Sequence, residues 1–120
     1  MVVVAILVAL GRGGTQGASA GPAATPAVTL ALRAKGIAFS TLSLEVPANA
    51  PFAIRFANDD PVPHDVDIRA ADGTTTVVHQ ENVAGGSATI YEYPSLAPGR
   101  YLFICSVHPI PAMTGTLVVK

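Results

Sequence analysis

Residues 41–56 read Thr41-Leu-Ser-Leu-Glu-Val46-Pro-Ala-Asn-Ala-Pro51-Phe-Ala-Ile-Arg-Phe56. Apolar side chains recur at every second position on both sides of the central segment, which contains two prolines and an asparagine. A period of two is what a half-buried β-strand requires, because successive side chains of a strand point to opposite faces. The stretch therefore predicts two strands separated by a turn. The side chains expected to face the core are Leu42, Leu44, Val46, Phe52, Ile54 and Phe56.

Short segments rich in β-branched and aromatic residues continue on both sides of this stretch, and no internal repeat is present. Dipeptides that favour turns, such as Asp72-Gly73 and Pro98-Gly99, separate these segments. The expected strands are 28–33, 41–46, 52–56, 66–68, 75–79, 88–93, 101–105 and 116–119. Seven or eight strands at this spacing predict an all-β fold, a Greek-key β-sandwich.

Composition restricts the function further. The chain has 120 residues, half of them hydrophobic and 12% charged, which indicates one compact domain. Seven Lys and Arg residues against eight Asp and Glu residues give a net charge of −1, without the basic patch that nucleic-acid binding needs. We therefore expect no nucleic-acid partner, and a monomer is the default oligomeric state.

The N-terminal segment is typical of an export signal. Residues 2–10 are uniformly apolar, and Ala18-Ser-Ala20 has the small-residue pattern of a cleavage site. The alternative is an uncleaved apolar tail, which is too short to span a bilayer because a spanning helix takes about 20 residues. We expect a leader at 1–20, a flexible linker at 21–27 and the folded domain at 28–120. This predicts a periplasmic or extracellular location, or one on the outer face of the cytoplasmic membrane.

The chemistry-bearing residues lie near the C-terminus. Cys105, His108 and Met113 follow one another in a C-x2-H-x4-M pattern. Thiolate and thioether are soft ligands and imidazole is borderline, so this set favours copper over calcium or magnesium. His64, at the start of an expected strand, supplies a second imidazole. Two histidines and a cysteine with a weak axial methionine form a blue-copper electron-transfer site.

Each of these residues also has a purely structural interpretation. A single cysteine is often a small buried hydrophobe, and Met113 could simply pack the loop. His79 lies far from the cysteine loop and is expected to be a surface or hydrogen-bonded histidine rather than a ligand. Asp59-Asp60 reads as a solvated turn before a proline. Tyr91, Tyr93 and Tyr101 lie in strand patterns and are expected to pack in the sandwich.

Over roughly residues 28–120 the chain resembles the cupredoxin family, and specifically its plastocyanin-like branch, which has the same C-x2-H-x4-M spacing. The proline that follows His108 is similar to that of amicyanin-like members. The resemblance implies a single type 1 copper ion as cofactor. The ligands that it implies are His64, Cys105, His108 and Met113. One departure is Asp65, where the family usually has an asparagine that joins the histidine loop to the cysteine loop. An ionised carboxylate only accepts hydrogen bonds, so here the link requires a donor from Ser106 or the backbone.

Four protein ligands leave no open position on the metal, so the site predicts a single-electron carrier and no enzyme. Three histidines in the whole chain cannot supply the further centres of a multicopper oxidase or a copper nitrite reductase, and one cysteine cannot form a binuclear centre. A cysteine hydrolase would lack an orienting residue. The remaining alternative is a copper-delivery module. Residues 109–112 make the surroundings of His108 apolar, which predicts docking of redox partner proteins there.

Overall fold

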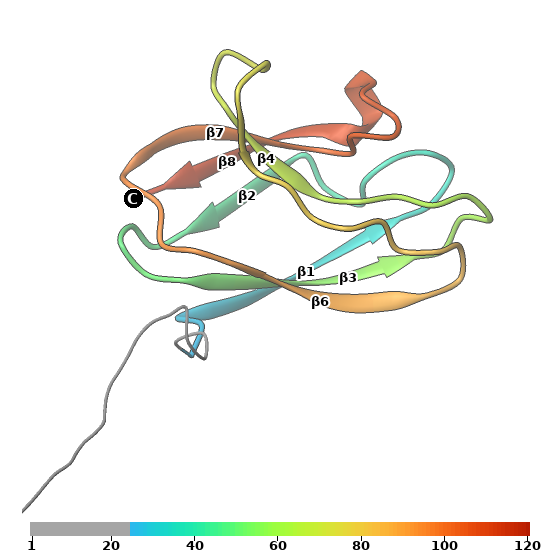
Figure 1. The fold of residues 1–120 in the computed structure, drawn as a ribbon, viewed down its shortest axis with the longest axis horizontal. Helices are drawn as coiled ribbons and strands as arrows, with labels where there is room; N and C mark the ends of the chain where they lie inside the picture. The colour runs from blue at the N-terminus through green and yellow to red at the C-terminus, as the bar shows by residue number, and fades with distance from the viewer. Residues whose placement is uncertain (1–24) are drawn as a thin grey trace, which may run out of the picture.

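The computed structural model describes residues 25–120 and shows two β-sheets packed face to face (Figure 1). The predicted leader and most of the predicted linker lie outside the described residues. The first strand, β1, begins at Val28.

Eight strands make up the two sheets. The smaller sheet has the order β1-β3-β6, with β1 parallel to β3 and β6 antiparallel to it. The larger sheet has the order β2-β8-β7-β4-β5, with only the β2–β8 pair parallel. The strands are β1 (Val28–Ala34), β2 (Ser43–Val46), β3 (Phe52–Asn58), β4 (Asp67–Ala70), β5 (Thr76–Val78), β6 (Ala88–Tyr93), β7 (Gly99–Ile104) and β8 (Thr114–Val119). The predicted all-β sandwich is confirmed, and the chain crosses between the sheets several times.

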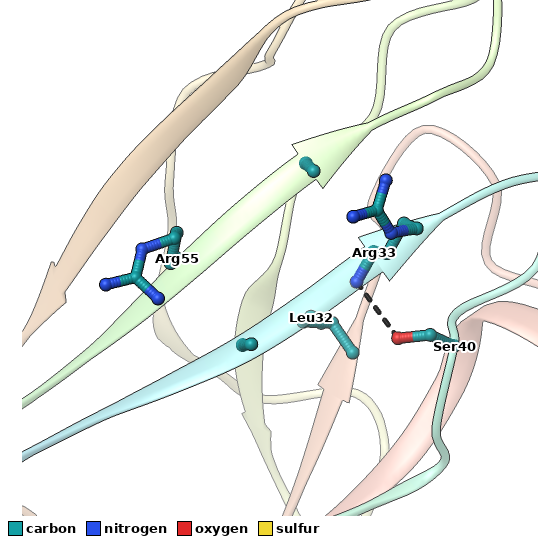
Figure 2. Close-up of a pocket in the computed structure, with 6 residues that line it drawn as sticks. Leu32, Arg33, Ser40 and Arg55 are labelled. Atoms are coloured by element: carbon teal, nitrogen blue, oxygen red, sulfur yellow. Dashed lines mark hydrogen bonds between the residues drawn. The ribbon is translucent and has the colours of Figure 1, made fainter.

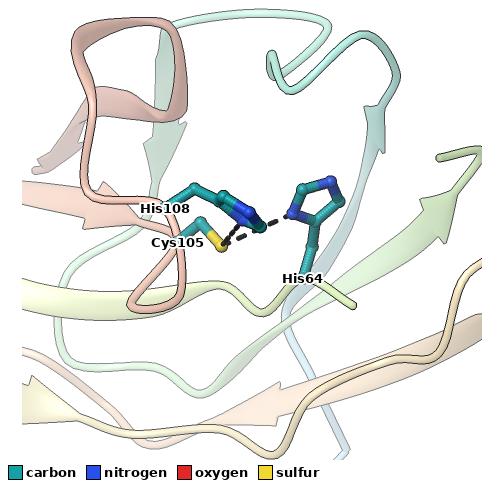
Figure 3. A group of neighbouring side chains, drawn as sticks. All are labelled: His64, Cys105 and His108. Carbon is teal, nitrogen blue, oxygen red and sulfur yellow. Dashed lines mark hydrogen bonds between the residues drawn. The ribbon is translucent and has the colours of Figure 1, made fainter. Parts of the chain in front are cut away.

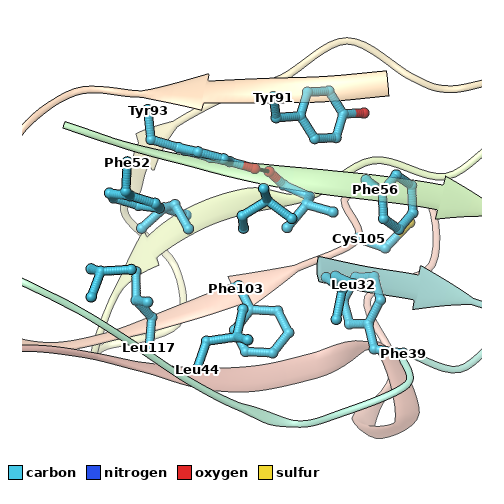
Figure 4. Packing of buried hydrophobic residues seen from close by; sticks show 14 of the residues in the cluster. Leu32, Phe39, Leu44, Phe52, Phe56, Tyr91, Tyr93, Phe103, Cys105 and Leu117 are labelled. Atoms are coloured by element: carbon cyan, nitrogen blue, oxygen red, sulfur yellow. Dashed lines mark hydrogen bonds between the residues drawn. The ribbon is translucent and has the colours of Figure 1, made fainter. Parts of the chain in front are cut away.

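Aromatic rings fill the space between the sheets (Figure 4). Phe52 stacks on Tyr93 with ring centroids 4.8 Å apart, and Phe56 stacks on Tyr91 at 5.9 Å. The Tyr93 hydroxyl donates a hydrogen bond to the carbonyl of Val66 across the sandwich, at 2.7 Å. A buried tyrosine needs such a partner, because an unpaired hydroxyl in the core costs stability. Both tyrosines therefore pack as the sequence predicts.

The alternating pattern of residues 41–56 is confirmed except at its first position. Leu42 is 45% exposed, whereas the other five predicted core side chains are buried. Strand β2 begins only at Ser43, so Leu42 lies in the connection before the strand. Its carbonyl still accepts a hydrogen bond from the Thr116 amide at 2.9 Å, but its side chain is not held against the core.

Gly115 is required by a close approach inside the larger sheet. It is the register partner of Phe103 across β7 and β8, and the Phe103 ring lies directly over it. A Cβ atom at this position would come within 2.2 Å of the ring and 2.9 Å of the Leu42 Cα. The glycine thus leaves room for a core aromatic ring.

We predict that Gly115→Ala destabilises the protein by about 1–3 kcal/mol, because either the ring or the backbone must move. Urea unfolding measures the loss. The same substitution in a Phe103→Leu background should cost less, since the nearest clash is then relieved. An equal cost in both backgrounds would show that the ring is not the obstacle.

Candidate metal centre

The predicted ligands come from two loops at one end of the sandwich. His64 lies between β3 and β4, and Cys105 directly follows β7. His108 lies in the next turn, and Met113 ends a short 3₁₀ helix, Pro111–Met113, before β8. His64, Cys105 and Met113 are fully buried, whereas His108 is partly exposed.

Two imidazoles converge on the thiol (Figure 3). The Cys105 Sγ lies 3.6 Å from Nδ1 of His64 and 3.9 Å from Nδ1 of His108. The structure thus brings together three of the four predicted ligands, with their donor atoms all within 4.8 Å of one another. The histidine at position 64 faces a cysteine that is 41 residues away in the sequence.

These separations fit a metal ion between the donors. An ion bonded to sulfur at about 2.3 Å and to imidazole nitrogen at about 2.05 Å, as zinc is in proteins, holds the two donors about 3.6–3.9 Å apart at angles of about 110–125°. The observed separations of 3.6 and 3.9 Å lie at these values. One thiolate with two imidazoles suits copper, so the group is compatible with a type 1 copper site.

The backbone around His64 is fixed by hydrogen bonds to a distant segment. The amide of His64 donates to the carbonyl of Val83 at 3.1 Å, and the amide of Val83 donates back at 2.7 Å. The buried Asn58 side chain donates to the same Val83 carbonyl at 2.9 Å. Gly85 allows the segment that contains Val83 to lie close to the histidine loop, because a Cβ at position 85 would lie 2.6 Å from the carbonyl oxygen of Asp60. The imidazole therefore does not depend on its own loop alone for its position.

The cysteine loop is closed on itself. The amide of Cys105 donates to the carbonyl of Met113 at 3.1 Å, which joins the two ends of the loop. Burial raises the pKa of the Cys105 thiol, while the backbone amides of Asp65, His108 and Val107 act in the opposite direction. These amides stabilise the thiolate form, which is the form that binds metal.

Asp65 joins the two loops. Its buried carboxylate accepts a hydrogen bond from the Ser106 amide at 2.6 Å and a second from the Ser106 hydroxyl. The link expected from Ser106 or the backbone is therefore confirmed, with both donors in use. Because Asp65 follows His64 and Ser106 follows Cys105, the bonds hold two predicted ligands in fixed relation.

Asp60 is a site residue that the sequence interpretation missed. It is only 6% exposed, and its Oδ2 lies 2.8 Å from Nε2 of His64. Burial alone would raise the pKa of Asp60, but hydrogen bonds with His64 and with two backbone amides outweigh it and lower the pKa. The solvated-turn interpretation is wrong for Asp60 and holds for Asp59, whose exposed carboxylate pairs with Arg33. No sequence signal separated Asp60 from Asp59, because a spacing of four residues brings side chains together on a helix and residues 59–64 are not helical.

His79 lies apart from the group that contains His64, as predicted. Its Nδ1 is 2.8 Å from Oδ2 of the buried Asp67, and its side chain is 66% exposed. Asp65, Asp67 and His79 form a second group whose ligand atoms all lie within 4.8 Å of one another. The hydrogen bond to Asp67 and the charge of that carboxylate raise the pKa of His79.

This raised pKa predicts a pH-dependent contribution to stability. A histidine whose pKa is higher in the folded state stabilises the fold fully below its unfolded pKa of 6.5, and loses that contribution as the pH rises through the folded value. The difference in free energy of unfolding between wild type and His79→Ala should therefore be larger below pH 6.5 than in alkaline solution. Denaturant titrations across this range test the expectation, and a pH-independent difference would contradict it.

A pocket of about 190 Å³ lies elsewhere, on β1 and β3 (Figure 2). It is lined by Ala31, Leu32, Arg33, Ser40, Arg55 and Ala57. None of the predicted ligands contributes to it, so it is separate from the metal centre.

Comparison with known proteins gives a consistent result. The sequence model of the cupredoxin-like domain family matches residues 2–119. Auracyanin B is 25% identical in structural alignment, with a TM-score of 0.72 over 82% of this chain and 93% of its own. Auracyanin A, a "blue" copper protein from Chloroflexus aurantiacus, is 25% identical, with a TM-score of 0.67 over 77% of this chain and 98% of its own.

A copper-containing nitrite reductase from Thermus scotoductus also matches. It is 24% identical, with a TM-score of 0.56 over 86% of this chain but 25% of the reductase chain, and it shows the fold alone. A search of curated protein sequences finds no match.

Proposed function

The chain belongs to the cupredoxin-like domain family, and on this basis we propose that it is an exported blue copper protein that carries single electrons between redox partners. In this proposal His64, Cys105, His108 and Met113 bind one type 1 copper ion. The observation that carries the proposal is the convergence of the two imidazole Nδ1 atoms on the Cys105 sulfur, at 3.6 and 3.9 Å. Similarity to auracyanin A, which is described as a blue copper protein, supports the choice of metal.

The surrounding protein supports electron transfer rather than catalysis. Bound copper would supply a one-electron Cu(II)/Cu(I) couple. Four protein ligands leave no coordination position for a substrate, and burial of His64, Cys105 and Met113 excludes water from them. Hydrogen bonds hold the loops in one arrangement, so the ligands need to move little when an electron arrives or leaves. We therefore propose no enzymatic activity.

Electrons would enter and leave through His108, which is the partly exposed member of the set. Val107 and Ile110 beside it are each 41% exposed, and residues 109–112 are all apolar. We call the exposed surface of residues 107–112 the His108 patch. A weakly charged apolar surface suits brief docking with a partner protein, which is what a carrier requires.

We also propose that the protein is exported and acts as a monomer. The predicted leader supports export to the periplasm, the cell exterior or the outer face of the membrane, with the domain acting as a monomer. In residues 25–120 no helix is long and apolar enough to cross a membrane.

Reconstitution with Cu(II) tests the proposed site. Wild type should show an intense visible thiolate-to-copper absorption band with the EPR signature of type 1 copper and a reversible couple. Cys105→Ser should abolish the band, because the thiolate that produces it is gone. Met113→Leu should retain copper and change the reduction potential, since the axial ligand tunes it. His79→Ala is the matched control and should leave the band intact.

A colourless protein that binds Cu(I) and exchanges it readily would contradict the electron-carrier proposal. That result would support the alternative of copper delivery.

Docking at the His108 patch is tested with a charge. Ile110→Glu should slow electron exchange with protein partners by tenfold or more, because burying a charge in an apolar contact costs docking free energy. A loss of about 1.4 kcal/mol already corresponds to a factor of ten. Ile90→Glu is the control, since Ile90 is also exposed, at 57%, but lies on β6 in the other sheet. Stopped-flow kinetics measure both variants, and equal rates for the two would argue against the patch.

A further inference from the structure

The carboxylate of Asp60 receives three hydrogen bonds in a buried position. Its Oδ1 accepts from the amide of Gly36 at 2.6 Å, and its Oδ2 accepts from the amide of Ile37 at 2.9 Å. Oδ2 also lies 2.8 Å from Nε2 of His64. A buried carboxylate is stable only when hydrogen bonds replace the water that it has lost, and here both oxygens are used.

The backbone that supplies two of these donors is strained at Ile37. Gly36 has a φ of 67° and Ile37 a φ of 55°, so both lie in the left-handed region. For a β-branched residue such as isoleucine this conformation is rare and costs about 1–2 kcal/mol. It directs two consecutive amides at the same carboxylate, an arrangement that binds anions. The surrounding structure thus maintains a strained turn at the residues whose amides bind the Asp60 carboxylate.

The hydrogen-bond partners of Asp60 decide which nitrogen of His64 carries the hydrogen. The two backbone amides can only donate, and an ionised carboxylate has no hydrogen to give, so Asp60 accepts from all three of its neighbours. Nε2 of His64 must then carry the hydrogen. In a neutral imidazole this leaves the lone pair on Nδ1, which is the atom that faces the Cys105 sulfur at 3.6 Å.

We propose that Asp60 is a positioning residue for the copper site: it holds His64 in the tautomer that presents Nδ1 to the metal, and its negative charge favours Cu(II) over Cu(I). The effect of the Asp60 charge on the copper ion rests on the proposed function, whereas the assignment of the His64 tautomer does not. A carboxylate that accepts from the far nitrogen of a ligating histidine makes the imidazole a stronger donor, and the more highly charged ion gains more from it.

The tautomer can be measured without copper. In the metal-free protein labelled with ¹⁵N, long-range ¹H–¹⁵N spectra distinguish a protonated Nε2 from a protonated Nδ1. We expect His64 to show a single protonated Nε2. A protonated Nδ1, or averaging between the two forms, would overturn the proposal. This measurement needs no variant and stays valid if the protein proves not to be blue.

The charge effect is tested with a pair of adjacent substitutions. Asp60→Asn and Asp59→Asn remove the same charge, but Asp59 is exposed and pairs with Arg33 at the surface. For Asp60→Asn we expect the ratio of Cu(II) to Cu(I) affinity to fall by tenfold or more, which is a rise in reduction potential of about 59 mV. For Asp59→Asn we expect less than about a threefold change, because solvent screens an exposed charge.

Redox titration of the visible band measures both variants. Equal shifts in the two would overturn the electronic role of Asp60. If wild type shows no such band, the proposed function fails, and the His64 tautomer in the metal-free protein alone decides the role of Asp60. The same measurement decides it if Asp60→Asn does not fold.

Discussion

The approach of two imidazole nitrogens to one buried sulfur is the constraint on which the rest of this structure depends. His64 and Cys105 come from different loops, and their donor atoms are 3.6 Å apart. The paired strands β7 and β8 hold both ends of the cysteine loop, whereas His64 lies in the connection between β3 and β4. Side chains and distant backbone groups fix the rest of the two loops. Asn58 and Val83 hold the first loop, and the bond between Cys105 and the Met113 carbonyl closes the second.

Two buried carboxylates complete this framework. Asp60 holds the far nitrogen of His64, and Asp65 holds both hydrogen-bonding groups of Ser106. Burying a carboxylate is costly unless it is fully hydrogen-bonded, and both residues satisfy this condition. Their negative charge beside a thiol makes the end of the sandwich a favourable place for a cation. The strained turn at Ile37 belongs to the same arrangement, because its amide completes the shell around Asp60.

In the proposed function, the fixed arrangement of these loops serves electron transfer. An electron carrier works fastest when its site has the same shape in both oxidation states, and a site fixed by backbone bonds on several sides meets that requirement. Burial of the thiol and of His64 would keep water and substrates away from a bound metal, while His108 reaches the surface. The similarity to auracyanins A and B extends over nearly the full length of those chains.

The amino-acid sequence by itself determined the strands and the local part of the metal site. Alternation of apolar residues is a property of neighbours, so β3 and β6 were predicted close to their observed limits, and the C-x2-H-x4-M pattern lies within one loop. Only the tertiary structure decided which distant groups meet. Asp59 and Asp60 look alike in the sequence, yet one is exposed beside Arg33 and the other is buried against His64. Leu42 fits the apolar pattern but lies outside β2, because the strand begins where pairing with β8 begins. Burial and hydrogen bonding between distant segments depend on how the two sheets pack, and no local pattern records that packing.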